Sequence, residues 1–152
     1  MKMSTRGRFG LRSLLHLAAR GENGPVSVSE IASEMDVSSD YLMQLFVKLR
    51  REGLLESMRG PRGGFKFARP AESITIGDVV RSVEGSLSPI HCVEEEPGRV
   101  IEEGDAELCE KAPTCPSRKA WVYITKKLVS LFDSITLADI LRTGEEKGLL
   151  AV

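Results

Sequence analysis

Three cysteines in a polar stretch of the chain are the residues whose chemistry stands out. Cys109 and Cys115 have five residues between them, and Cys92 lies seventeen positions before Cys109. Thiolates bind metal ions and iron–sulfur clusters, and two nearby thiols can form a reversible disulfide. An odd number of cysteines argues against a structural disulfide framework. These thiols are therefore candidates for a metal or cluster site, or for a redox switch.

The spacing of the cysteines helps to rank these chemistries. A structural zinc site usually shows two ligands separated by two to four residues and four clear Cys or His ligands, and that pattern is absent. Iron–sulfur clusters are held by thiolates, and Pro113 and Pro116 stiffen the loop around Cys115. Cys109 and Cys115 are also close enough in sequence to pair as a thiol switch. A cluster, a thiol switch and, with less support, zinc all remain open at this point.

The cysteines lie in a segment, residues 86–116, that lacks hydrophobic periodicity and holds four Pro and seven Glu. A loop of this length in a small domain is usually functional or disordered. Before it, Thr75 and Asp78 predict a capped helix that ends at Gly85. After it, a long helix is expected from Ser117, with an apolar seam made of Trp121, Ile124, Leu128 and Leu131. So small a domain offers an extended helix little core, so we expect this seam to contact a second copy of the chain.

The first half of the chain predicts a winged helix-turn-helix. Ser27 and Glu30 form a capping box before one helix, and a short turn at 36–39 leads to a second helix that ends near Gly53. Strands are expected at 54–58 and 65–68, joined by the basic turn at 59–64. The expected fold is mainly α with a small β-hairpin wing and a long C-terminal dimerisation helix.

In this arrangement the second helix lies in the major groove of DNA and the hairpin contacts the minor groove or the phosphates. Gln44 can pair with adenine through two hydrogen bonds, and Met43 can offer apolar contact to a thymine methyl. Side chains that avoid the apolar face of the helix, together with the arginines of the hairpin, are the candidate DNA contacts: Ser39, Tyr41, Met43, Gln44, Lys48, Arg59 and Arg62.

Charge is divided unevenly along the chain. Residues 1–70 hold 12 Lys and Arg against 7 Asp and Glu, a net of +5, whereas residues 71–152 hold 9 against 15, a net of −6. This division favours a polyanion-binding half joined to a module with another task. Neither a signal peptide nor an apolar run of membrane-spanning length is found, so we expect a cytoplasmic protein without a membrane partner. No phosphate-binding glycine loop occurs, and only His16 and His91 are available as bases, so an enzyme is not expected.

These motifs resemble those of the Rrf-two family of bacterial winged-helix transcriptional regulators, which includes iron–sulfur sensors of the IscR and NsrR kind. The resemblance is carried by "MKMSTRGRFGLRSLLHLA", by the pattern SxxYLxQLFxKLRxxGLxxSxRGxxGG, by "ITIGDVVRSVEG" and by "ITLADIL". It implies a homodimer that binds a double-stranded DNA operator. It also implies an iron–sulfur cluster held by Cys92, Cys109 and Cys115, with [2Fe–2S] favoured over [4Fe–4S].

Two positions depart from the family pattern. Arg118 stands where IscR-like members have a histidine as fourth ligand, and a guanidinium offers no free lone pair. His91, the acidic run at 94–96, or His16 from a second copy are therefore the expected donors. Met43 stands where a glutamate of IscR contacts bases, so the operator sequence does not transfer.

Together these features predict three parts: a DNA-binding domain at 1–85, a cysteine-containing sensor loop at 86–116, and a dimerisation helix with a last helix at 117–152. The predicted function is a transcriptional regulator whose operator binding is controlled by the cluster. The alternative keeps the same fold but senses through a protein partner or a thiol/disulfide switch without a cluster.

Overall fold

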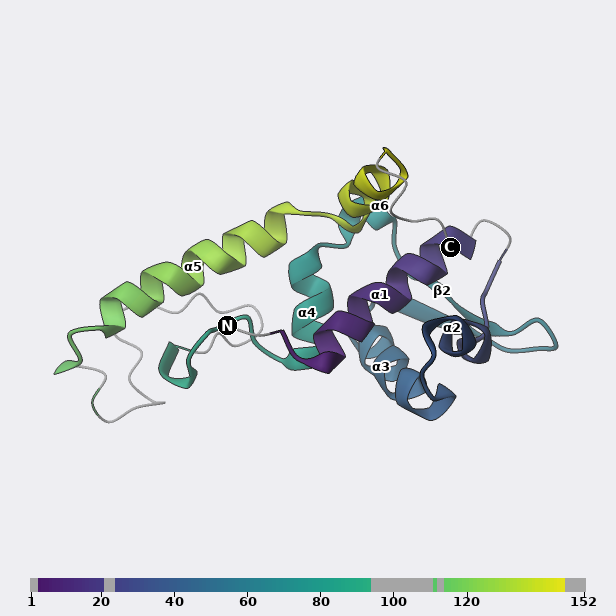
Figure 1. Cartoon of the computed structure of the whole chain (residues 1–152), viewed down its shortest axis with the longest axis horizontal. Helices are drawn as coiled ribbons and strands as arrows, with labels where there is room; N and C mark the ends of the chain where they lie inside the picture. The colour runs from purple at the N-terminus through teal and green to yellow at the C-terminus, as the bar shows by residue number, and fades with distance from the viewer. Residues whose placement is uncertain (1–2, 21–23, 94–110, 112–113, 147–152) are drawn as a thin grey trace.

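The structure, a computed structural model, describes residues 3–20, 24–93, 111 and 114–146 (Figure 1). Most of these residues are helical, and the two strands form a single antiparallel hairpin. The elements in chain order are α1 (Thr5–Arg20), α2 (Val28–Met35), α3 (Ser39–Arg51), β1 (Leu55–Met58), β2 (Gly64–Phe67), η2 (Ala71–Ser73), α4 (Ile76–Glu84), η3 (His91–Val93), α5 (Arg118–Ser134) and α6 (Leu137–Glu146).

Local sequence chemistry explains the helix-turn-helix formed by α2 and α3. The capping box before α2 is present, with Glu30 N donating to Ser27 Oγ and Ser27 N to Glu30 Oε2. Asp36 ends α2 in the left-handed conformation, with φ at 55°. Ser38 then caps α3 by accepting a hydrogen bond from Tyr41 N. Because a capped end satisfies backbone donors that the helix cannot, these residues fix the turn between the two helices.

The wing is a short hairpin attached to the body by a backbone pair. Leu55 pairs with Phe67 at its base and Met58 with Gly64 near its tip. Val26 and Phe65 exchange two backbone hydrogen bonds of 2.9 Å. The chain just before α2 therefore pairs with β2 through an isolated antiparallel bridge. A Cβ at Gly64 would lie 2.3 Å from Val26 O, so only glycine permits this approach.

One hydrophobic core holds the winged-helix body together. It is filled by buried side chains from α1, α2, α3, the hairpin and α4, among them Leu14, Ile31, Leu42, Phe46 and Val79. Leu137, at the start of α6, lies in the same core. The last predicted part of the chain therefore contributes directly to the packing of the first.

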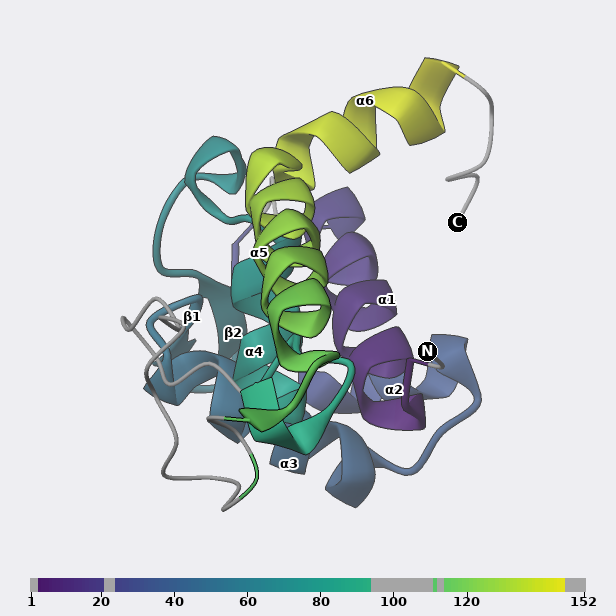
Figure 2. The same ribbon diagram turned by 90° about the vertical axis from the view of Figure 1, so that its left-hand side faces the viewer.

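The long helix α5 lies against α4 only near its C-terminal end and extends away from the winged-helix body (Figure 1). Viewed from the side on which the N-terminal end of α5 lies, α5 overlies α4, with α1 to one side (Figure 2). Val129 and Phe132 pack on the cluster formed by Ile76, Val80 and Leu87. Near the other end, Val122 packs on Val93 of η3. No helix in the described part of the chain is long and apolar enough to cross a membrane.

The expected fold, mainly helical with a hairpin wing, is confirmed, and the boundaries differ by a few residues. Helix α3 begins at Ser39, since Ser38 caps it, and α6 runs ten residues from Leu137 to Glu146. Thr136 and Asp139 cap α6, with Asp139 N donating to Thr136 Oγ1.

Candidate DNA-binding surface and cysteine site

The face of α3 opposite the core presents polar and apolar side chains to solvent. Leu42, Leu45, Phe46 and Leu49 are buried on one side of the helix. Ser39 and Gln44 are exposed on the other, and Met43 is 42% exposed. These three predicted contact residues are therefore accessible on the outward face of α3.

Two other predicted contact residues are placed differently. Tyr41 is half-buried, with its ring 6.0 Å from that of Phe9 in an edge-on arrangement. Its hydroxyl oxygen is buried and has no hydrogen-bond partner among the described residues. Lys48 is also half-buried, and its Nζ donates to Val83 O of α4 at 3.5 Å. Both side chains join α3 to its neighbours, so the outward placement expected for them is not what the structure shows.

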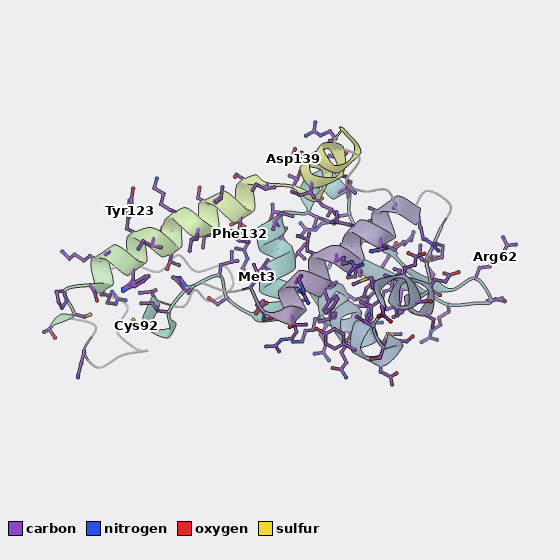
Figure 3. All side chains as sticks on the ribbon, in the orientation of Figure 1. Met3, Arg62, Cys92, Tyr123, Phe132 and Asp139 are labelled. Atoms are coloured by element: carbon purple, nitrogen blue, oxygen red, sulfur yellow. The ribbon has the colours of Figure 1, made fainter. Side chains whose placement is uncertain are left out.

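The hairpin tip carries the remaining predicted contacts. Arg59 and Arg62 are exposed, and Arg62 extends from the end of the hairpin farthest from α5 (Figure 3). Arg50 Nη1 donates to Ser57 Oγ at 3.2 Å, which links the end of α3 to β1. This contact joins the hairpin to the end of α3, and both elements carry exposed arginines.

Helix α1 adds exposed arginines that the sequence analysis did not assign to this surface. Arg6, Arg8 and Arg12 are exposed, and the Arg8 guanidinium lies 5.0 Å from the centre of the Phe9 ring. Because Phe9 in turn contacts Tyr41, Arg8 is joined through two rings to the first turn of α3. The run of arginines in α1 is the signal in the sequence that points to these residues.

Two of the three cysteines flank the first turns of α5. Cys92 lies on η3 and packs, with Ile90 and Trp121, against the buried pair Val93 and Val122. Cys115 lies three residues before the start of α5, and both thiols are free and half-buried. Figure 3 shows Cys92 beside this end of α5, far from Arg62 on the hairpin.

The electrostatic surroundings of Cys115 favour its ionised form. A hydrogen bond between Cys115 Sγ and Ser117 Oγ, at 3.4 Å, lowers the pKa of the thiol below its ordinary value, and a further hydrogen bond from the Ser117 backbone lowers it again. The thiolate is the form that binds metals and attacks disulfides. Cys115 is therefore chemically suited to either predicted role.

Some of the other expected ligands lie outside the described residues, and His16 has a partner within its own chain. Cys109, the acidic run at 94–96 and the side chain of His91 lie outside the described residues. Within the described part of the chain no group of three or more His, Cys, Asp or Glu is arranged to hold a metal ion. His16 is buried between α1 and α2, with Nδ1 3.1 Å from Glu34 Oε2, so in this chain it already has a partner. Arg118 is 4% exposed at the first turn of α5.

One face of α5 remains apolar and exposed. Ile124 is 39% exposed and Leu131 54%, while Trp121 and Leu128 are half-buried. Trp121 packs partly within its own chain, on the cluster around Val93. The side of the helix that faces the body is a separate stripe: Arg118, Val122, Thr125, Val129 and Phe132. The predicted seam thus leaves apolar surface for a partner.

A helix-turn-helix followed by a basic hairpin is the architecture of a winged-helix DNA-binding protein. Similarity to known proteins identifies the family to which the chain belongs. The family model for Rrf2, described as an iron-dependent transcriptional regulator, matches residues 3–143. The chain is 36% identical over 142 residues to protein rrf2 of Nitratidesulfovibrio vulgaris, covering 93% of this chain and 88% of that protein. The protein belongs to the Rrf2 family of transcriptional regulators.

Two solved structures show the same architecture. IscR from T. potens aligns with a TM-score of 0.72 at 33% identity, covering 97% of this chain and 90% of that one. CymR, the global cysteine regulator of B. subtilis, aligns with a TM-score of 0.69 at 34% identity, covering 94% and 98%. Family membership makes this protein a DNA-binding transcriptional regulator and not an enzyme.

Proposed function

We propose that this regulator acts in the cytoplasm as a homodimer that binds a roughly palindromic, double-stranded operator. Ser39, Met43 and Gln44 would contact base edges in the major groove, while Arg59 and Arg62 would contact phosphates or enter the minor groove. The exposed apolar side chains of α5 support a second copy as its partner. Two copies would present two recognition helices to half-sites about one helical turn apart.

We further propose that Cys92, Cys109 and Cys115 hold an iron–sulfur cluster, [2Fe–2S] rather than [4Fe–4S], whose state controls operator binding. The observation that carries this proposal is the position of Cys92 and Cys115 at the same end of α5, together with the lowered pKa of the Cys115 thiol. These thiols fit a cluster, since its iron atoms are bound by thiolates. A bound cluster would supply iron–thiolate bonds that respond to oxidation and to iron supply.

A structural change at the cysteines would be transmitted to α5 through the packing of η3 on that helix. Val93 and Val122 bury the contact between η3 and α5, so a displacement of Cys92 would disturb that packing. Because α5 also bears the exposed apolar face, the change would reach the dimer contact. The fourth ligand is expected among the acidic run at 94–96, His91, or a donor of the second copy, since Arg118 has no free lone pair.

A second candidate function is a regulator that senses oxidation through its thiols alone. The lowered pKa of Cys115 favours it, because a thiolate reacts faster with oxidants. Cys109 and Cys115 would form a disulfide by giving two electrons and two protons to an oxidant. Sensing through a protein partner is the other alternative, and it would not need the cysteines.

Anaerobic purification separates these candidates. We expect a brown protein that contains iron and acid-labile sulfide, and each of Cys92→Ala, Cys109→Ala and Cys115→Ala should lower its iron content. Thr114→Ala, next to Cys115 and exposed, is the matched control and should keep the colour. A colourless protein that loses two free thiols on oxidation, with altered DNA binding, would favour the thiol switch. A colourless protein whose binding ignores oxidants would leave the protein-partner alternative.

A further inference from the structure

The end of α5 approaches the start of α4 unusually closely at Gly77. A Cβ at this position would lie 1.9 Å from Asp133 Oδ1 and 2.9 Å from Arg81 Nη2. The Asp133 carboxylate therefore occupies space that any other residue at 77 would fill. Arg81 Nη2 donates to Asp133 Oδ1 at 2.5 Å, so the carboxylate is paired where it meets α4.

The charged contacts continue from Arg81 towards the hairpin. Arg81 Nη2 lies 3.7 Å from Asp78 Oδ1, and Asp78 Oδ2 accepts a hydrogen bond of 2.8 Å from Arg69 Nη2. Arg69 follows the end of β2 by two residues. Side chains of alternating charge thus connect the base of the hairpin, α4 and the last turn of α5. We call Arg69, Gly77, Asp78, Arg81 and Asp133 the α4–α5 junction.

Backbone hydrogen bonds beside the junction hold the chain after α5 in place. Ile76 N donates to Ile135 O at 2.8 Å, and Leu137 N donates to Ile74 O at 2.8 Å. These bonds fix the position of residues 135–137 whatever their side chains. The direction of α5 from that point depends on side chains: Asp133 in the junction, Val129 and Phe132 on the cluster around Val80, and Val122 on Val93 of η3.

A small rotation of α5 about the junction causes a large displacement of the opposite end of the helix. Helix α5 has 17 residues, which makes it about 25 Å long at the usual rise per residue. A rotation of about 10° at the junction would move its other end by roughly 4 Å, which is more than the ~3.4 Å between successive base pairs. Ile124 lies about 14 Å along the helix from Asp133, so the same rotation would move it by roughly 2 Å. A second copy packed on this face would be both shifted and tilted relative to the first.

We propose that Gly77, Arg81 and Asp133 are positioning residues that set the half-site spacing of the operator. This inference rests on the proposed function, in which a dimer formed through α5 binds DNA. The three residues belong to α4 and α5, not to α3 or to the hairpin tip. They fix the angle between α5 and the winged helix, and that angle determines where the second recognition helix lies.

The wild type first selects operator DNA from a pool of random sequence. Versions of this operator are then made with the half-sites one base pair closer together or farther apart. The affinity for each version is measured for the wild type and for Gly77→Ala, Asp133→Ala and Asp133→Asn. We expect the wild type to prefer one spacing. The ratio of affinities for the preferred and the altered spacing should fall about threefold to tenfold in the variants, the range expected when a contact network is broken. Alanine favours helix at position 77, so Gly77→Ala should keep α4 while displacing the Asp133 carboxylate.

Two controls distinguish positioning from a general loss of stability. Arg142→Ala removes an exposed ion pair with Asp139 on α6, outside the junction, and should keep the spacing preference. Gly77→Ala combined with Asp133→Ala should behave as Asp133→Ala alone, because the carboxylate that the added methyl would displace is absent. If the wild type selects no DNA, the proposed function fails. If it does and all variants keep its spacing preference, even with uniformly weaker binding, the positioning role is overturned.

Discussion

At the scale of single residues, the Cys115 thiol shows how a local hydrogen bond prepares a side chain for chemistry. The hydroxyl and the backbone of Ser117 both stabilise the thiolate, and the thiol pKa is lowered as a result. A thiol with a lowered pKa is ionised to a greater extent at neutral pH, where an ordinary thiol is mostly protonated. The same property serves iron binding and oxidation, so it supports both candidate sensing chemistries.

Ser117→Ala should therefore raise the pKa of Cys115 and slow its alkylation at neutral pH. The rate of iodoacetamide labelling, followed against pH by peptide mass spectrometry, should show its midpoint at higher pH than in the wild type. Thr114→Ala removes a hydroxyl that donates to Lys111 O and should leave the midpoint in place. An unchanged midpoint in Ser117→Ala would show that Ser117 does not set the thiol pKa.

Single residues of the DNA surface should differ in what they contribute. Gln44→Ala removes an exposed side chain of α3 and should relax base preference at one position per half-site, at a cost of ~1–3 kcal/mol. Arg62→Ala at the hairpin tip should instead weaken binding to all sequences and reduce the salt dependence by about one phosphate contact. Binding curves at several salt concentrations measure the effect of Arg62→Ala. Binding to operators changed at single base pairs measures the effect of Gln44→Ala. An unchanged salt slope in Arg62→Ala would mean that the hairpin does not contact the backbone.

At the scale of elements, the hairpin depends on its attachment to the segment before α2. The Phe65 ring lies 5.1 Å from that of Phe46 in an edge-on arrangement, and its backbone pairs with Val26. The face of β2 that packs on α3 is thus fixed by one aromatic contact and two hydrogen bonds. An isolated two-stranded hairpin is only marginally stable, so this attachment holds the wing in position.

Gly64→Ala should disrupt this attachment, since the added methyl would meet Val26 O at 2.3 Å. Backbone atoms cannot turn aside as a side chain can, so we expect a loss of about 1–3 kcal/mol in the free energy of unfolding. Thermal unfolding should show a lower Tm, and DNA affinity should fall as the wing shifts. Lys66→Ala, which removes only a partly exposed pair with Glu56, should change the Tm little. Equal Tm values for the two variants would contradict this account.

At the scale of the whole molecule, α5 has one face that packs within the chain and another that is exposed. The stripe with Val122 and Phe132 packs within the chain, while Ile124 and Leu131 remain exposed on the helix that extends from the body. Exposed apolar side chains on one face of an extended helix are typical of a surface that contacts a partner. A symmetric dimer through this face would use the same residues of both copies.

Replacing Ile124 and Leu131 together by Asp should therefore produce monomers. Two charges in an apolar contact are costly without partners, and DNA affinity should collapse because two half-sites are no longer bound together. Sedimentation at several protein concentrations measures the oligomeric state. Lys126→Asp, an exposed position outside the apolar face, is the control and should remain dimeric. A double variant that stayed dimeric would place the dimer contact elsewhere.

Much of the winged-helix architecture could be predicted from the sequence because its signals are local. The Ser27–Glu30 and Thr75–Asp78 capping boxes form as expected, and Gly85 ends α4 with φ at 99°. Caps and turns depend on residues within three or four positions of each other, so neighbouring sequence is enough. The placement of Ser39, Met43 and Gln44 followed from the helical period of α3 in the same way.

The sequence by itself determined the elements, the family pattern and the candidate thiols, whereas contacts between distant residues were decided only by the tertiary structure. Periodicity showed that α5 has apolar stripes, but the packing of Val129 and Phe132 on α4 decided which stripe faces the body. Tyr41, Lys48 and His16 took partners on other elements, namely Phe9, Val83 and Glu34. The contact between Gly77 and Asp133 joins positions 56 residues apart. The physical reason is that a side chain's partner depends on how whole elements pack, which no local pattern encodes.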